Sequence, residues 1–219
     1  MAYLIGTDTL FVHPPKTGGK AVLQALRLAG HRVRPVRSPG WHNGHATAEQ
    51  CRDRRYTWAC VFGFVRHPVA WWQSLRDFCN TPGGRAFDID PKLKHPYRSI
   101  LDDCREFRDA DADTFVRAVA IDRNPGFYGS MLRGYYGDDF SGADWIGRQE
   151  TLARDLAAFC RWRGLIVPAA VPPVNVSAPT FIRRVSVATA KQVENTEGDV
   201  VRQFYATRGT TDVAQGVRI

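Results

Sequence analysis

The chain has 219 residues, of which 44% are hydrophobic and 24% are charged, a composition typical of a globular domain and not of a disordered or fibrous protein. It contains no apolar run of the roughly 20 residues that are needed to span a bilayer, and residues 1–10 lack the basic segment of a secretory signal. These features predict one domain over residues 1–219, in the cytoplasm and without a membrane as partner.

The net charge of +8 is unevenly distributed along the chain. Residues 1–85 hold 12 Lys and Arg against 4 Asp and Glu, whereas residues 86–150 hold 9 against 13. A basic surface of this kind favours a polyanionic ligand, and nucleic acid would suit it as well as a smaller anion. The five cysteines are widely spaced and form no CxxC pair, so the sequence predicts reduced, buried thiols and neither a disulfide framework nor a metal site.

The N-terminal part of the chain alternates between strand-like and helix-like segments. Residues 9–13 are mostly apolar or β-branched and predict a short buried strand. Residues 18–29 carry apolar side chains at helical spacing, which predicts a helix that ends at Gly30. A second strand is expected at residues 31–36, and Thr47 is placed to cap a short helix that follows it.

The next segment, residues 56–65, is almost entirely apolar, aromatic or β-branched, the pattern of a central parallel strand buried on both faces. Pro68 is well placed in the first turn of a following helix. Residues 80–96 are rich in Gly and Pro, and we expect a mobile active-site segment there. Helices are expected at residues 97–107, 113–121, 127–135, 151–163 and 199–207, a last strand at 145–147, and a Pro-rich connection at 167–180. This order predicts an α/β domain with a central, largely parallel sheet.

The segment HPPKTGGK, residues 13–20, stands between the first predicted strand and the first predicted helix. Backbone N–H groups of a glycine-rich turn at the positive end of a helix dipole form a cradle for phosphate. A Walker A motif aligned on Gly19-Lys20 would need a glycine at Pro14 and a Mg²⁺-binding hydroxyl at Ala21. A metal-dependent NTPase or kinase is therefore disfavoured, and Lys16 is the better candidate for the charge that meets the phosphate.

The same segment resembles the 5′-phosphosulfate loop of the sulfotransferases that use 3′-phosphoadenosine 5′-phosphosulfate (PAPS), which reads His-x-Pro-Lys-Thr-Gly-Gly followed by Thr or Ser. The resemblance implies a P-loop-like, three-layer α/β/α domain that needs no metal. It also implies that the 5′-phosphosulfate is bound by the loop residues Pro15, Lys16, Thr17, Gly18, Gly19 and Lys20. Lys20 departs from the family pattern, because it stands where a hydroxyl residue is usual.

A second motif is found in FVRHPVAWWQS, where Ser74 follows Arg66 by eight residues and Pro68 lies between them. Arg66 would sit at the carboxyl end of a parallel strand, where ligands of open α/β sheets bind. The resemblance implies that Arg66 and Ser74 hold the 3′-phosphate, although Trp71 stands where the family often has an arginine. A weaker likeness over residues 145–156 implies that Arg148 reaches the nucleotide.

These resemblances imply transfer of a sulfuryl group from PAPS to an acceptor hydroxyl or amine, with 3′-phosphoadenosine 5′-phosphate (PAP) as the product. Lys16 would stabilise the negative charge that grows on the leaving phosphate oxygen. His45 is the first choice for the general base, because a loop histidine titrates near neutral pH, and His42 and Glu49 are the alternatives. The acceptor stays open among a carbohydrate, a tyrosine, a lipid and a small alcohol.

The sequence leaves two alternative functions open. A nucleotide or small-molecule kinase with an atypical P-loop should need Mg²⁺, for which Ala21 offers no ligand. A basic nucleic-acid-binding protein should present stripes of aromatic and basic side chains. The six tryptophans are scattered instead, and we expect Trp71 and Trp72 to pack in a core, so nucleic acid is disfavoured as a partner.

Overall fold

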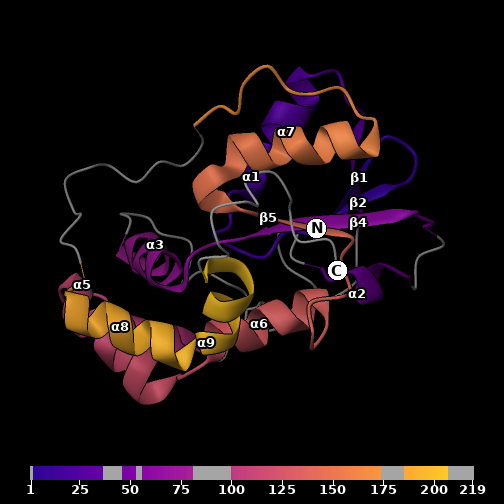
Figure 1. Ribbon diagram of the computed structural model, residues 1–219. Coiled ribbons are helices and arrows are strands. Elements are labelled where there is room, and N and C mark those ends of the chain that lie inside the picture. The colour runs from indigo at the N-terminus through magenta and orange to yellow at the C-terminus, as the bar shows by residue number, and fades with distance from the viewer. Residues whose placement is uncertain (1, 37–45, 53–55, 81–99, 174–184, 207–219) are drawn as a thin grey trace. The chain divides into compact units, whose positions relative to one another are not determined.

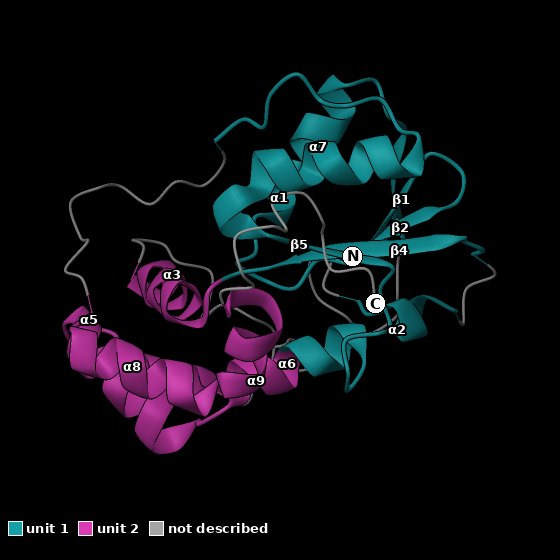
Figure 2. Ribbon diagram, in the orientation of Figure 1, with its two compact units in different colours: residues 1–66, 132–175, 207–219 teal, residues 67–131, 176–206 magenta. Residues whose placement is uncertain are grey.

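The computed structural model describes residues 2–36, 46–52, 56–80, 100–173 and 185–206. These residues divide into two compact units (Figure 2). Unit 1 takes its described residues from the ranges 1–66 and 132–175, and unit 2 takes them from 67–131 and 176–206. The expectation of a single domain over the whole chain stays a prediction.

Unit 1 is built on a five-stranded sheet in the order β3-β1-β2-β4-β5 (Figure 1). Its strands are β1 (Ala2–Ile5), β2 (Thr9–Phe11), β3 (Val33–Val36), β4 (Cys60–Val65) and β5 (Trp145–Arg148). β1 is antiparallel to both β2 and β3, whereas β4 is parallel to both β2 and β5. The sheet is therefore mixed, and the prediction of a largely parallel sheet is wrong.

The short connection between β1 and β2 explains this difference. Only residues 6–8 join the two strands, and Tyr3 pairs with Phe11 while Ile5 pairs with Thr9. A connection of this length can only reverse the chain, because a parallel neighbour needs a crossover of a dozen or more residues. β4 follows β2 after a helix, a strand and a second helix, and this longer path allows parallel pairing.

The core of unit 1 lies between the sheet and two helices, α1 (Gly19–Leu28) and α7 (Leu152–Arg163), which cover one face (Figure 1). Phe62 of β4 is fully buried there and stacks on Phe159 of α7, with 4.0 Å between the ring centroids. Burial of a side chain of this size stabilises the fold by about 1.5–3 kcal/mol. On the opposite face, the hydroxyl of Tyr136 donates to the carbonyl oxygen of Phe64 at 3.2 Å.

The short helix α2 (Ala48–Arg52) begins at a reciprocal cap. The N–H of Gln50 donates to Oγ1 of Thr47 at 3.2 Å, and the N–H of Thr47 donates to Oε1 of Gln50 at 2.9 Å. This pair is a capping box, which satisfies two backbone donors at once. The predicted capping role of Thr47 is confirmed.

The described residues of unit 2 form helices. They are α3 (Pro68–Asn80), α4 (Leu101–Glu106), α5 (Ala112–Phe115), the π-helix η2 (Val116–Arg123), the start of α6 (Phe127–Tyr136), α8 (Val187–Thr196), α9 (Gly198–Val200) and the π-helix η5 (Val201–Tyr205). From Leu132 onward, α6 belongs to unit 1. Trp71 and Trp72 are fully buried, and Trp71 stacks on Tyr128 with 4.7 Å between the ring centroids. Their predicted place in a core is confirmed.

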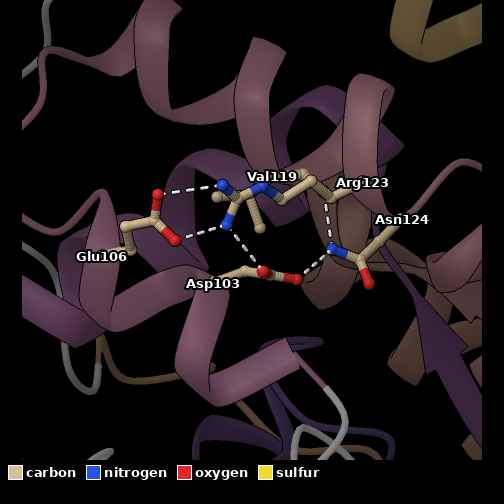
Figure 3. Close-up of polar contacts among 5 residues, drawn as sticks. All are labelled: Asp103, Glu106, Val119, Arg123 and Asn124. Carbon is tan, nitrogen blue, oxygen red and sulfur yellow. Dashed lines mark hydrogen bonds and ion pairs between the residues drawn. The ribbon is translucent and has the colours of Figure 1, made fainter.

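Charged side chains of unit 2 join its helices to one another. Arg123, at the end of η2, donates to both carboxylate oxygens of Glu106 at 2.6 and 2.9 Å, and to Asp103 at 2.9 Å (Figure 3). Asn124 donates to the second oxygen of Asp103 at 2.8 Å. The network joins the end of the π-helix η2 to α4. Packing of these helices is therefore enough to explain why charged residues stand at these positions, and no ligand is needed to explain them.

The five cysteines are free and buried, as predicted. The thiols of Cys79 and Cys104 are hydrogen-bonded, and this bond together with burial raises the pKa of Cys104. Among the described residues, no helix is long and apolar enough to cross a membrane. Residues 81–96 of the predicted mobile segment and 174–180 of the Pro-rich connection lie outside the described residues.

Candidate functional site

Three parallel strands of unit 1 end at the same edge of the sheet. β2, β4 and β5 are neighbours, and the backbone N–H of Val12 extends the ladder by donating to Phe62 at 2.9 Å. Val65 at the end of β4 pairs with Arg148 at the end of β5, so Arg66 follows directly beside that pair. The carboxyl ends of these three strands therefore bring together the loop that follows β2, Arg66 after β4 and Arg148 at the end of β5. Ligands of α/β sheets bind at this edge of the sheet, where the strands end.

The loop between β2 and α1 has a backbone suited to an anion. Lys16 and Gly18 both adopt left-handed conformations, with φ of 66° and 84°. Alternation of left-handed and right-handed residues turns successive N–H groups toward one side, which forms an anion-binding concavity. The side chain of Thr17 is buried and donates to the carbonyl oxygen of Pro14 at 2.7 Å, so this hydroxyl holds the loop together.

The N-terminus of α1 follows directly on this loop. Gly18 is its N-cap residue, no side chain of a described residue caps it, and its first turn carries no acidic residue. The partial positive charge of a helix N-terminus attracts anions. Lys20 is the second residue of α1 and is exposed to solvent, so it adds a full positive charge to the same turn.

Two loop glycines are required by close neighbours. A Cβ atom on Gly19 would overlap the ring of His13, and a Cβ atom on Gly18 would lie 3.2 Å from Cδ2 of Leu152. The glycines therefore let the loop pack between a ring on one side and the start of α7 on the other.

The ring of His13 packs against the loop and against Gly19 in the first turn of α1. Its ring stacks on Phe11 with 5.7 Å between centroids, and its Nδ1 lies 3.2 Å from the carbonyl oxygen of Pro14. Burial, together with the positive charge of nearby Lys20, lowers the pKa of His13 to about 4. The imidazole is therefore neutral near pH 7.

Arg66 contacts the loop directly. Its Nη1 donates to the carbonyl oxygen of Lys16 at 3.3 Å, and its side chain is partly buried. The contact holds a guanidinium group beside the loop, so two residues predicted to bind phosphate groups are brought together. A guanidinium group binds phosphate through charge-assisted hydrogen bonds.

Arg148 is held at its backbone. Its N–H donates to Oδ2 of Asp155 at 2.9 Å, and the hydroxyl of Thr151 donates to the same oxygen at 2.8 Å. The 3₁₀ turn η3 (Gln149–Thr151) between β5 and α7 is thus fixed by a nearly buried carboxylate. Sequence reasoning missed Asp155; the signal was an acidic residue in the first turn of a helix that directly follows a strand.

The remaining predicted site residues are divided between unit 2, unit 1 and the part of the chain that the structure does not describe. Ser74 lies on α3 and belongs to unit 2, so its role beside Arg66 stays a prediction. His67 also belongs to unit 2, where its Nε2 lies 3.5 Å from Glu194. His45 and His42 lie outside the described residues, and Glu49 is exposed on α2 in unit 1. The described residues contain no group of three or more His, Cys, Asp and Glu that could hold a metal ion.

Comparison with known proteins found no family model, no curated protein and no solved structure that matches the chain.

Proposed function

We propose that the protein is a sulfotransferase that moves the sulfuryl group of PAPS to an acceptor hydroxyl or amine. The observation that carries this proposal is the meeting of the loop, Arg66 and Arg148 at the carboxyl ends of three adjacent parallel strands. A ligand with phosphate groups at both ends of a nucleoside suits cations from several strand ends. The P-loop-like three-layer arrangement is part of the proposal.

The residues fit the two ends of PAPS in different ways. The loop, with its two left-handed residues, and the N-terminus of α1, which no side chain of a described residue caps, suit the 5′-phosphosulfate, with Lys16 and Lys20 as its cations. Arg66 suits the 3′-phosphate, and the resemblance adds Ser74 as its second ligand there. Pro15, Thr17, Gly18 and Gly19 contribute through the shape of the loop and its backbone donors.

In the proposed reaction, the acceptor oxygen or nitrogen attacks sulfur while the bond between sulfur and the 5′-phosphate oxygen breaks. Negative charge grows on that phosphate oxygen, which leaves as part of PAP. Lys16 and the loop N–H groups stabilise this charge, a contribution worth about 10²–10³ in rate when a single donor is lost. No step requires a metal.

The acceptor also loses a proton. We propose His45 as the general base, with His42 and Glu49 as alternatives. His45→Ala should abolish turnover while PAP still binds with its native affinity. Turnover close to that of the native protein would move the role to another residue, and the same assay on His42→Ala and Glu49→Gln would identify it.

The central experiment is a thermal titration with PAP, carried out with and without Mg²⁺. PAP at about 100 times its Kd should add roughly 2.7 kcal/mol of stability, which corresponds to a rise in Tm of about 5–10 °C for a chain of this size. The rise should not depend on Mg²⁺. No rise with PAP, together with a Mg²⁺-dependent rise with ATP, would favour the kinase alternative and contradict the proposal.

A further inference from the structure

Asp155, in the first turn of α7, is hydrogen-bonded to the end of β5, where Arg148 lies. It is only 9% exposed, and its Oδ2 accepts both the backbone N–H of Arg148 and the hydroxyl of Thr151. Its other oxygen, Oδ1, accepts Nε of Arg154 at 3.1 Å. Burial of a carboxylate is costly unless hydrogen bonds compensate it, and here they come from both ends of one short turn.

The turn that Asp155 fixes also touches the loop. It starts at Arg148 and continues through Gln149 to Leu152, the first residue of α7. A Cβ atom on Gly18 would lie 3.2 Å from Leu152 and 3.4 Å from Cγ of Gln149, so the turn packs directly against the loop at the N-cap of α1. The carboxylate of Asp155 thus fixes a turn that begins at the cationic residue Arg148. The same turn contacts the loop through Gln149 and Leu152.

We propose that Asp155 is a positioning residue of the nucleotide site, which fixes the backbone of Arg148 so that its guanidinium group meets the anionic ligand bound by the loop. The inference rests on the proposed function. An arginine side chain loses considerable conformational freedom when it binds, and a rigid backbone reduces what must still be ordered. Arg66 reaches the loop through its side chain, whereas Arg148 is held through its main chain.

A carboxylate in the first turn of α7 could also serve only to stabilise that helix through its dipole. A double-mutant cycle separates the two roles, because interaction energies appear only when two residues act on the same event. The four proteins are the native chain, Asp155→Asn, Arg148→Ala and the double variant. The measurement is the Kd of PAP by calorimetry at one salt concentration, with the Tm of each protein as the reading of stability.

If Asp155 acts through Arg148, Asp155→Asn should weaken PAP about 10-fold in the native chain. In the Arg148→Ala background the same substitution should weaken PAP less than about 2-fold, although Tm falls equally in both backgrounds. An equal loss of affinity in both backgrounds would overturn the inference. A native chain that does not bind PAP would instead refute the proposed function, and the inference with it.

Two further variants keep the test decisive. Thr151→Val removes one donor to the same oxygen, so it replaces Asp155→Asn if that variant fails to fold, with an expected loss of about 3-fold that disappears without Arg148. Arg154→Ala is the matched control, since it removes the half-exposed partner of the other oxygen. It should leave the Kd within about 2-fold; a loss as large as that of Asp155→Asn would contradict the positioning role.

Discussion

The N-termini of two helices, one in each unit, differ in whether a side chain caps their backbone N–H groups. At the start of α6 in unit 2, the carboxylate of fully buried Glu197 accepts the N–H groups of Tyr128 and Gly129 at 3.0 and 2.7 Å. At the start of α1 in unit 1, no side chain of a described residue caps the helix. The same electrostatic position is filled by the protein's own anion in one unit, and suits an external anion in the other.

The arginines of the two units differ in the same sense. Arg123 of unit 2 contacts two carboxylates and serves the packing of helices (Figure 3). Arg66 of unit 1 contacts a loop carbonyl oxygen at a sheet edge. A positive charge in the sequence therefore indicates a ligand site only when the surrounding backbone is arranged for an anion, and the following experiments test this comparison.

The largest effect is expected from Lys16→Ala, measured as turnover of PAPS. Loss of the cation beside the leaving oxygen should lower kcat by about 10²–10³, while the backbone carbonyl of residue 16, which accepts from Arg66, is retained. The Tm of the variant is the control. A kcat within a few-fold of the native value would show that Lys16 does not act on the leaving group.

Glu197→Ala should remove the carboxylate that caps the N-terminus of α6. Two buried backbone N–H groups lose their acceptor, which should reduce the free energy of unfolding by about 3 kcal/mol, read from urea denaturation. The Kd of PAP, measured on the folded fraction, should not change. A weaker PAP affinity at unchanged stability would mean that the acidic helix end takes part in ligand binding.

Arg66→Ala should weaken PAP about 30–100-fold, because charge-assisted hydrogen bonds to a phosphate are lost. Adenosine 5′-phosphosulfate, which lacks the 3′-phosphate, should lose far less. Arg123→Ala is the matched control and should leave both affinities unchanged. Equal losses for the two nucleotides would assign Arg66 a structural role.

Gly19→Ala should disturb the loop through the ring of His13, which the added methyl group would overlap. Overpacking of this kind usually costs about 1–3 kcal/mol. Gly134→Ala, in α6, has open space around the added methyl group and should be neutral or stabilising, by up to about 1 kcal/mol, since alanine favours a helix. A thermal melt of both variants distinguishes them, and similar Tm values for the two would contradict the close packing at Gly19.

The smallest effect concerns pH. The pKa of His13 is lowered to about 4 in the fold, against 6.5 in the unfolded chain. The unfolded state therefore binds the proton first as pH falls, and stability that is fully present above pH 6.5 is lost toward pH 4. Between pH 7 and pH 5 the loss should be about 2 kcal/mol. His13→Gln should remove this part of the slope; an unchanged slope would exclude His13 as its source.

Local signals predicted the elements around the site well. The Lys-Thr-Gly-Gly turn, the buried strand before Arg66 and the capping role of Thr47 each depend on residues close together in the chain. The strand β1 was missed, although its apolar residues and the turn after them are typical of a hairpin. Asp155 was also missed, because its role depends on a turn that folds back onto the loop.

The sequence by itself determined the strand-loop-helix junction at residues 9–28 and the strand that ends before Arg66, since hydrophobic pattern and turn chemistry act over a few residues. Only the tertiary structure decided which strands are neighbours. Pairing of β2 with β4 and of β4 with β5 brings Lys16, Arg66 and Arg148 to one edge, and such pairing depends on long-range packing, which no local pattern specifies.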